Sequence, residues 1–257
     1  MIKDLEFLFK KIFINESYLL KKRLKRAISK GYEKELKIID KFADKSKDAL
    51  DIGVYRGVYS YKLSQNFKYI HSFEPNPLLF PYLEKNLNKI ISNLKLYNLA
   101  LSNNNGTTEL KLPLRSKSIF QDNIEELFRL GAATMHPNNE IRNYKKVPIN
   151  MKKLDDIKIE NKIGLIKIDV EGHEKNVIQG GIETVKKNKP ILLVEIEERH
   201  TKTPVIDIIK FINSIGYKTF ISKGENLIDI EKISDYSKEN NFFFLPKDHR
   251  LIQSIGQ

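Results

Sequence analysis

Short apolar segments alternate with helix-length polar spacers in this chain, and this alternation restricts its fold more than any other feature. The segments are ALDIGV (49–54), YIHSFE (69–74), LKLYNLAL (94–101), GLIKIDV (164–170) and PILLVEI (190–196). Nearly continuous apolar runs of this length are typical of parallel strands that helices cover on both faces. The pattern therefore predicts an α/β fold with a doubly wound, mostly parallel sheet.

The last part of the chain has a different pattern. GYKTFIS (216–222) and NNFFFLP (240–246) flank a polar stretch, so we expect an antiparallel C-terminal hairpin that closes one edge of the sheet. Two spacers have helical periodicity: FPYLEKNLNKI, which follows two prolines, and HEKNVIQGGIETVKKN, which ends just before Pro190. We expect a helix in each spacer.

The 257 residues are enough for one principal domain. Apolar positions recur at helical spacing over residues 3–45 and the pattern breaks near Gly31, which predicts two N-terminal helices. We divide the chain into a basic helical extension (1–47) and an α/β domain (48–257) with an insertion at 113–148. We expect a short helix at DNIEELFRL in this insertion, which is either a surface loop or a cover over the cleft.

The net charge of +12 is concentrated at the start of the chain, where residues 1–47 hold 14 Lys/Arg against 7 Asp/Glu and so contribute +7. The densest group, here called the basic cluster, is Lys21, Lys22, Arg23, Lys25 and Arg26. A solvated helix face, a peripheral membrane contact, an acidic glycan and nucleic acid are all compatible with this charge. Charge alone does not choose among them.

The chain has no cysteine, which excludes disulfides, thiolate metal sites and cysteine nucleophiles. Its start has no signal-peptide pattern, and no apolar stretch approaches the ~18 residues that a membrane span needs. We therefore expect a soluble, cytoplasmic protein.

Two glycines, Gly53 and Gly57, follow the first predicted strand, and ligands of open α/β sheets bind beyond the carboxyl ends of the strands. The G-x-G-x-x-G pattern of dinucleotide sites and the Gly-Lys-Ser/Thr ending of phosphate loops are both missing, which disfavours NAD and ATP. The pattern is instead Asp51-x-Gly53-x-x-x-Gly57, with Glu74 at the end of the next strand, 23 residues after Asp51.

An acid at the position of Glu74 can accept both hydroxyls of a ribose. Further carboxylates follow two other predicted strands, Asp169 and Glu195, and together with Asp51 they suit a sulfonium cation. The missing phosphate cradle agrees with an adenosyl cofactor that has no phosphate. The pattern therefore favours S-adenosylmethionine.

The stretches LIKIDVEGHEKNVIQGG and PILLVEI, with the glycine loop, resemble the FkbM-type family of S-adenosylmethionine-dependent methyltransferases, from about Glu35 to Pro246. The resemblance implies a class I methyltransferase-like (Rossmann-type) fold and methylation of a hydroxyl on a sugar, glycan or related small molecule. It implies that the cofactor-binding positions are Asp51, Gly53, Tyr55, Gly57, Glu74, Leu99, Ala100 and Asp169. It also implies that Asp169, Glu171 and Gly172 form the motif near the transferred methyl, and that Glu195 is the acid that closes the fifth strand. Val54 and Tyr55 stand where the family usually has alanine and asparagine, and the Tyr55 hydroxyl can still donate one hydrogen bond.

Methyl transfer to oxygen requires an aligned acceptor and a group that removes its proton. We expect catalysis from Asp169, His173 and Glu195, with His173 as the leading base because imidazole titrates near neutral pH. Alternatively, His173 only caps a helix or faces solvent. Asp169 and Glu195 could also gather a divalent cation with His200, a less favoured hypothesis, so no metal site is assigned.

Two other functions stay open. A non-catalytic module could bind an adenosyl ligand through the same loop. A nucleic-acid methyltransferase would use the positive charge, but the Asn/Asp-Pro-Pro-aromatic motif that holds a flipped base is missing after the fourth predicted strand, where the chain reads DVEG. A small-molecule or glycan acceptor is therefore favoured over nucleic acid.

Overall fold

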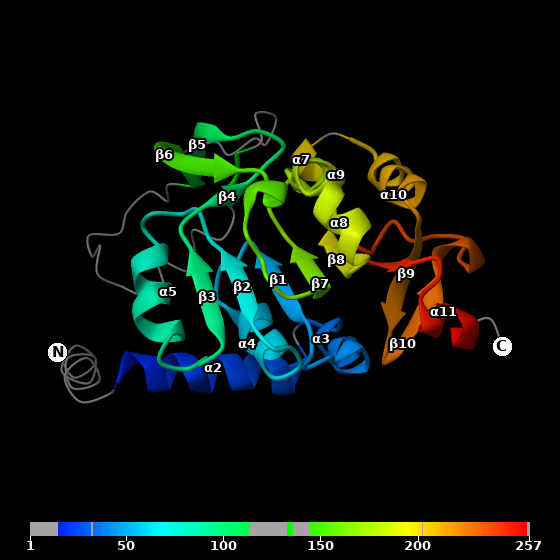
Figure 1. Cartoon of the computed structure of the whole chain (residues 1–257), viewed down its shortest axis with the longest axis horizontal. Helices are drawn as coiled ribbons and strands as arrows, with labels where there is room; N and C mark the ends of the chain where they lie inside the picture. The colour runs from blue at the N-terminus through cyan, green and yellow to red at the C-terminus, as the bar shows by residue number, and fades with distance from the viewer. Residues whose placement is uncertain (1–14, 32, 114–132, 136–143, 202, 256–257) are drawn as a thin grey trace.

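A computed structural model of the chain describes residues 15–31, 33–113, 133–135, 144–201 and 203–255. In this part an eight-stranded sheet has the order β10-β9-β11-β8-β7-β1-β2-β3 (Figure 1). Its strands are β1 (Asp48–Ile52), β2 (Ile70–Phe73), β3 (Leu94–Tyr97), β7 (Ile163–Ile168), β8 (Ile191–Glu195), β9 (Tyr217–Lys223), β10 (Asn226–Asp229) and β11 (Asn241–Pro246). The five strands from β8 to β3 pair in parallel, and β11 runs antiparallel to both of its neighbours. The predicted doubly wound, mostly parallel sheet is confirmed.

Helices cover both faces of this sheet. They are α2 (Glu16–Lys30), α3 (Leu36–Ile39), α4 (Val58–Ser64), α5 (Phe80–Leu87), α7 (Glu174–Gly180), α8 (Ile182–Asn188), α9 (Glu198–Thr201), α10 (Val205–Ser214) and α11 (Arg250–Ile255), with 3-10 turns η1 (Asp40–Phe42), η3 (Leu154–Asp156) and η4 (Ile230–Lys232). One core cluster joins the sheet to α7, α8 and α10, and another joins it to α3 and α4. Neighbouring residues of one strand serve opposite faces: Leu165 belongs to the second cluster and Ile166 to the first. This explains why apolar residues occur at successive positions of these strands and do not alternate with polar ones.

The helix α2 lies along α4 and α5 at the outside of the fold (Figure 1). Its buried residues Leu20 and Leu24 belong to one cluster with residues of α5. The side chain of Asn15 accepts a hydrogen bond from the N–H of Ser17 at the start of the helix, and Gly31 ends it with a left-handed φ of 62°. The predicted break near Gly31 is therefore confirmed. The basic cluster lies on the exposed side of α2, and residues 1–14 lie outside the described part.

The segment LKLYNLAL does not form one strand, and this prediction was wrong. Its first half is β3, while its second half is β4 (Ala100–Leu101), which belongs to a second sheet of order β4-β6-β5. Asn98 lies at the break, and its side-chain amide donates to the carbonyls of Glu74 (2.9 Å) and Pro75 (3.2 Å). These bonds hold the chain where it leaves the large sheet.

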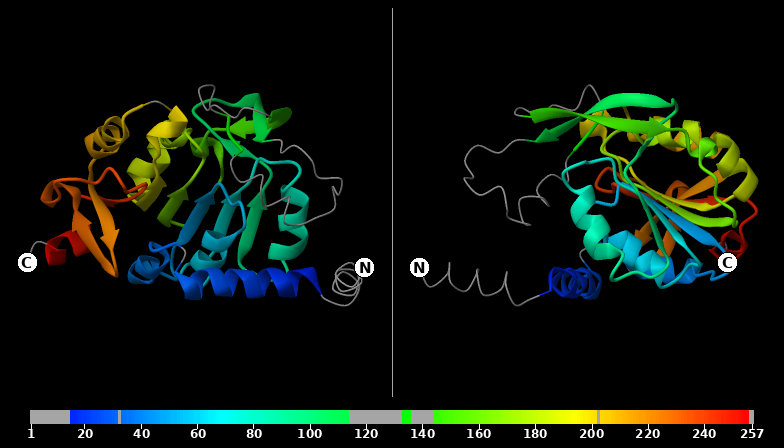
Figure 2. Two further views of the ribbon diagram at one scale, coloured as in Figure 1. Left: turned by 180° about the vertical axis from the view of Figure 1, so that it is seen from behind. Right: turned by 60° about the vertical axis from the view of Figure 1, so that its left-hand side comes forward.

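The other strands of the small sheet are β5 (Gly106–Pro113) and β6 (Tyr144–Lys152), which pair antiparallel over their length. They overlap the ends of the predicted insertion. The predicted helix at DNIEELFRL lies outside the described residues. In the right-hand view of Figure 2, the small sheet stands over one edge of the large sheet.

The predicted antiparallel pair of β9 and β11 is confirmed, but its position differs from the prediction. The strand β10, formed by part of the polar stretch between them, is the edge strand, and β11 lies inside the sheet between β8 and β9. The predicted helix after β7 is divided at Gly181 into α7 and α8, and a Cβ atom at this glycine would collide with the side chain of Leu154. No helix within the described ranges is long and apolar enough to cross a membrane.

Candidate functional site

A cavity of about 500 Å³ lies at the carboxyl ends of β1, β2, β7 and β8, where the small sheet covers it. Its lining includes the residues Ile52, Gly53, Tyr55, Arg56, Phe73, Glu74, Leu99, Ala100, Leu110, Ala133, Met135, Asp169, Glu171 and Glu195. Its volume is in the range of small-molecule sites. Ala133 and Met135 show that the described part of the insertion reaches the cavity, in agreement with a covering role.

The loop after β1 crosses the loop after β7 at Gly53. The N–H of Gly53 donates to the carbonyl of Phe73 (3.0 Å), and the N–H of Asp169 donates to that of Ile52 (2.9 Å). A Cβ atom at Gly53 would lie only 1.8 Å from the carbonyl oxygen of Asp169, and φ there is 91°. Only glycine fits this crossing. Gly57 has φ 79° and starts α4, but it does not line the cavity.

Asp51 lies beneath the cavity and is not part of its lining. Its side chain is buried and accepts a hydrogen bond from the hydroxyl of Ser60 on α4, whose oxygen is also 2.9 Å from that of Ser72 on β2. Burial raises the pKa of Asp51 to about 7, although the bond from Ser60 acts in the opposite direction. Asp51 therefore joins β1 to α4 and supports the loop from below.

Glu74 lines the cavity and holds the loop at the same time. One carboxylate oxygen accepts the N–H of Tyr55 (3.0 Å) and the other accepts the N–H of Asn76 (2.9 Å). Burial raises its pKa to about 7. A carboxylate offers about four acceptor sites, so both oxygens keep a free lone pair for a ligand.

Tyr55 has an unusual backbone and an amphipathic environment. Its φ is 49°, in the left-handed region. Its ring lines the cavity and packs against the cluster that contains residues of α2 and α5, and the guanidinium of Arg56 lies 4.9 Å from the ring centre. The N-terminal helix and the cavity loop are thus packed together through one apolar cluster.

Asp169 and Glu195 form a carboxyl pair in the cavity wall, with the ammonium of Lys167 behind them. The lysine Nζ lies 3.9 Å from Asp169 Oδ2 and 3.7 Å from Glu195 Oε2. The Asn240 amide donates to Glu195 Oε1 (2.9 Å) and to Glu197 Oε1 (3.0 Å). Burial and the charge of Asp169 raise the pKa of Glu195 well above its usual value.

Lys167 is a further residue of the site, and the sequence carries a signal for it. A lysine inside a buried apolar strand is rare unless an acidic partner faces it. GLIKIDV contains such a lysine, two residues before a predicted site carboxylate.

His173 is at the start of α7, and its Nε2 is 2.9 Å from the hydroxyl of Ser102. It is not among the residues that line the cavity. The loop before it is held by Glu174, whose carboxylate accepts the N–H groups of Gly172 (2.9 Å) and Val170 (3.4 Å). The side chain of His200 lies outside the described part. No group of three side chains that could hold a metal ion occurs among the residues described.

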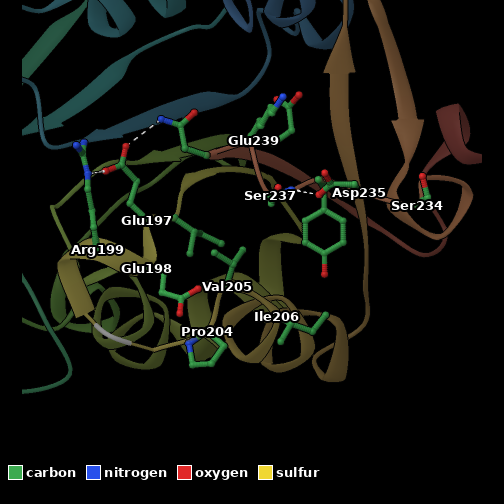
Figure 3. A pocket seen from close by; sticks show the side chains of 14 residues that line it. Glu197, Glu198, Arg199, Pro204, Val205, Ile206, Ser234, Asp235, Ser237 and Glu239 are labelled. Carbon is green, nitrogen blue, oxygen red and sulfur yellow. Dashed lines mark hydrogen bonds and ion pairs between the residues drawn. The ribbon is translucent and has the colours of Figure 1, made fainter.

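A second hollow, of about 690 Å³, adjoins this site (Figure 3). It is lined by residues 196–199 and 204–206, after β8, and by residues 234–240, before β11. Figure 3 shows Glu197 bonded to Arg199. The Asn240 amide donates to Glu197 and also to Glu195. The hollow and the carboxyl pair are therefore connected through one asparagine, whereas the glycine loop belongs to the 500 Å³ cavity alone.

The model of the methyltransferase FkbM domain matches residues 51–219, from β1 to β9. This chain belongs to the FkbM methyltransferase domain family. The match includes the glycine loop, Glu74 and the carboxyl pair, and it confirms the resemblance noted in the sequence. No curated protein matches the chain.

A solved structure of an FkbM methyltransferase shares the fold of this chain. The FkbM methyltransferase from Methylobacillus flagellatus KT has a TM-score of 0.50 and 17% identity over 78% of this chain and 44% of its own. This chain thus spans less than half of that protein. Lower TM-scores are found for the precorrin-6y C5,15-methyltransferase from Geobacter metallireducens GS-15 (0.40, 12% identity, 82% and 84% coverage) and an rRNA methylase from Streptococcus thermophilus (0.41, 10%, 83% and 92%). The predicted class I methyltransferase-like fold is confirmed.

Proposed function

We propose that this FkbM-domain protein is an S-adenosylmethionine-dependent methyltransferase that acts on a hydroxyl of a sugar, glycan or related small molecule. The observation that carries the proposal is a single cavity that holds both the glycine loop bonded to Glu74 and the carboxyl pair of Asp169 and Glu195. A cofactor loop and a proton-handling group must share one site for this reaction.

The chemistry of the lining fits this cofactor. S-adenosylmethionine supplies a methyl group on a sulfonium cation. Among the described residues that line the cavity, Glu33, Glu74, Asp169, Glu171 and Glu195 are acidic, and Arg56 is basic. Such an excess of carboxylates favours a cationic ligand without phosphate. In the proposal, Glu74 binds the ribose hydroxyls through its free lone pairs, and Leu99 and Ala100 contact the adenine.

The 690 Å³ hollow of Figure 3 supports a polyhydroxyl acceptor next to this cavity. Its acidic side chains are Glu197, Glu198, Asp235 and Glu239, against Arg199 and Lys238, and Tyr236 adds an aromatic ring. Carboxylates accept hydrogen bonds from hydroxyl groups, and an aromatic ring can contact the apolar face of a sugar. The excess of negative charge in a chain of net charge +12 disfavours acceptors with phosphates, including nucleic acids.

Asp169 is the base that this geometry favours. Its side chain is 34% exposed and lines the cavity, whereas His173 faces Ser102 and does not line it. In the proposal Asp169 accepts the hydroxyl proton. With an identified acceptor, Asp169→Asn should lower turnover by on the order of 10²-fold or more, and His173→Ala by much less. A larger loss of turnover in His173→Ala than in Asp169→Asn would identify His173 as the base.

Cofactor binding tests the first part of the proposal. Calorimetry with S-adenosylhomocysteine should give saturable heat, and Glu74→Ala should weaken binding at least about tenfold. Glu84→Ala, at an exposed position of α5 outside the cavity lining, is the matched control and should bind as the wild type does. A thermal melt of each variant separates lost binding from lost folding. Saturable NADH binding without heat from the adenosyl ligand would contradict the assignment.

Turnover tests the second part. Methyl-labelled S-adenosylmethionine should label a neutral sugar or glycan acceptor in a panel that also contains RNA and DNA. Tight S-adenosylhomocysteine binding without labelling of any acceptor would favour the non-catalytic binding module. Labelling of nucleic acid alone would favour the nucleic-acid methyltransferase.

A further inference from the structure

Lys167 is a fully buried lysine in the middle of the sheet, directly behind the carboxyl pair. It belongs to β7, which lies between β1 and β8, and its side chain is 1% exposed. Lysine is almost never buried to this extent unless charged or polar groups surround it. Its neighbours therefore indicate what its charge does in the site.

The ammonium of Lys167 faces four groups. It donates to Asn241 Oδ1 on β11 (3.0 Å), and it lies 3.9 Å from Asp169 and 3.7 Å from Glu195. It also lies 4.8 Å from the ring centre of Tyr59, whose buried hydroxyl has no hydrogen-bond partner in the described part of the chain. The ring face of Tyr59 therefore supports the cation. One positive charge thus serves two carboxyl groups.

Two ionised carboxylates beside one ammonium would leave an uncompensated negative charge in a largely buried site, which is costly. Burial of Glu195 and the negative charge of Asp169 beside it also raise the pKa of Glu195, so this carboxyl tends to keep its proton. The ionisable groups of the surrounding elements that interact electrostatically with the pair are Asp51, Glu74, Glu174, Glu197, Tyr59 and Arg199. Most of these groups are acidic, so they add to the tendency of the pair to keep one proton.

We propose that Lys167 is a positioning residue that holds the pair at one shared proton, with Asp169 ionised and Glu195 protonated. Glu195 is the more buried of the two, with 24% of its side chain exposed against 34% for Asp169. The cavity wall then presents one carboxylate, that of Asp169. The ammonium of Lys167 compensates its charge from the side of the sheet, and the carboxylate can face a cation or accept a proton. This inference rests on the proposed function for its purpose, but the charge state can be measured without any ligand.

The test is the pH dependence of unfolding. The slope of the unfolding free energy against pH gives the difference between the protons bound by the unfolded and native states. Between about pH 6 and pH 8 the wild-type pair holds one proton that the unfolded chain does not hold. In Lys167→Met the pair loses the positive charge beside it and should take up a second proton. The slope of the unfolding free energy against pH should then become more negative by the amount that corresponds to about one bound proton.

Lys62→Met is the matched control, because Lys62 is also buried, pairs with Asp40 (2.7 Å) and does not line the cavity. Its slope should equal that of the wild type. Glu195→Gln is the second variant, which decides the matter if Lys167→Met does not fold. It removes the proton-binding carboxyl, so its slope should be less negative than that of the wild type by the amount that corresponds to about one bound proton. An unchanged slope in Lys167→Met, or in Glu195→Gln, would overturn the inference.

Ligand binding separates this inference from the proposed function. At pH 7 the preference for cationic S-adenosylmethionine over neutral S-adenosylhomocysteine should fall about tenfold in Asp169→Asn and much less in Glu195→Gln, because only the first variant removes a charge. Equal losses would contradict the proposed charge state. If neither ligand binds the wild type, the proposed function fails, while the unfolding slopes still test Lys167.

Discussion

Replacing Gly53 by alanine should damage the fold and the cavity together. The glycine has φ 91°, which an L-residue adopts at a cost of roughly 1–2 kcal/mol. Its new Cβ would also lie 1.8 Å from the carbonyl oxygen of Asp169 and 2.9 Å from the carbonyl carbon. These are backbone atoms, so the loops after β1 and β7 would have to separate. This separation would weaken the bonds from Gly53 to Phe73 and from Asp169 to Ile52.

Gly216 provides a matched control for the backbone conformation. Its φ is 101°, close to that of Gly53, and a Cβ there would meet no atom within 4 Å. Gly216→Ala should therefore lose only the conformational term, about 1–2 kcal/mol. For Gly53→Ala we expect a total loss of about 4 kcal/mol or more, since collisions with backbone belong to the severe class of substitutions. In a chain of this size the difference corresponds to a melting temperature lower by on the order of 5–10 °C.

Urea denaturation of the two variants measures these losses, and calorimetry with S-adenosylhomocysteine measures the cavity. Gly216→Ala should keep wild-type affinity, because Gly216 does not line the cavity. Gly53→Ala should lose binding even at temperatures where it is folded. Equal destabilisation of the two variants would refute the argument, because it would mean that the crossing of the two loops adapts to a side chain without cost.

Three further predictions concern buried carboxyls and surface charge. Ser60→Ala removes the hydroxyl that donates to buried Asp51 and should lower the free energy of unfolding by about 1–3 kcal/mol. The loss should be larger at pH 8 than at pH 6, because the bond stabilises the charged form of Asp51. Denaturation at both pH values measures this difference. Burial raises the pKa of Glu174 to about 7. Its contribution to the free energy of unfolding is therefore complete below about pH 4.5 and is lost as the pH rises through 7. Glu174→Gln should remove this contribution, so the measured free energy of unfolding should fall less between about pH 5 and 7.5. We propose that the basic cluster on α2 contacts an anionic membrane surface, so sedimentation should show binding to anionic vesicles, whereas binding to RNA or DNA should be weak and steeply salt-dependent. Nanomolar binding to one nucleic acid at physiological salt would contradict this proposal.

The sequence predicted most of the large sheet because its signal is local. Strands such as β7 are apolar at successive positions, since Leu165 and Ile166 serve the two opposite core clusters. Much of the cavity lining was also predictable. Gly53, Glu74 and Asp169 each follow a parallel strand, and the carboxyl ends of such strands meet at one edge of the sheet.

The remaining features depend on contacts between distant segments. Apolar periodicity does not show that the chain leaves the large sheet at Asn98, because the break is held by side-chain bonds to the carbonyls of Glu74 and Pro75. The direction of His173 depends on Ser102, which is 71 residues earlier in the chain. The support of Lys167 by Asn241 spans 74 residues. A sequence pattern indicates which residues follow a strand, but not which way their side chains turn.

Tyr55 illustrates how a loop can keep its geometry after a change of residue type. Its φ of 49° is a conformation that asparagine adopts more readily than tyrosine. However, the bond that ties the loop to Glu74 comes from the backbone N–H, so it does not depend on the side chain at this position. The tyrosine ring adds packing against the apolar cluster that contains Leu20 and Leu24 of α2. The bulky residue is therefore compatible with a cofactor loop, and it links that loop to the N-terminal helix.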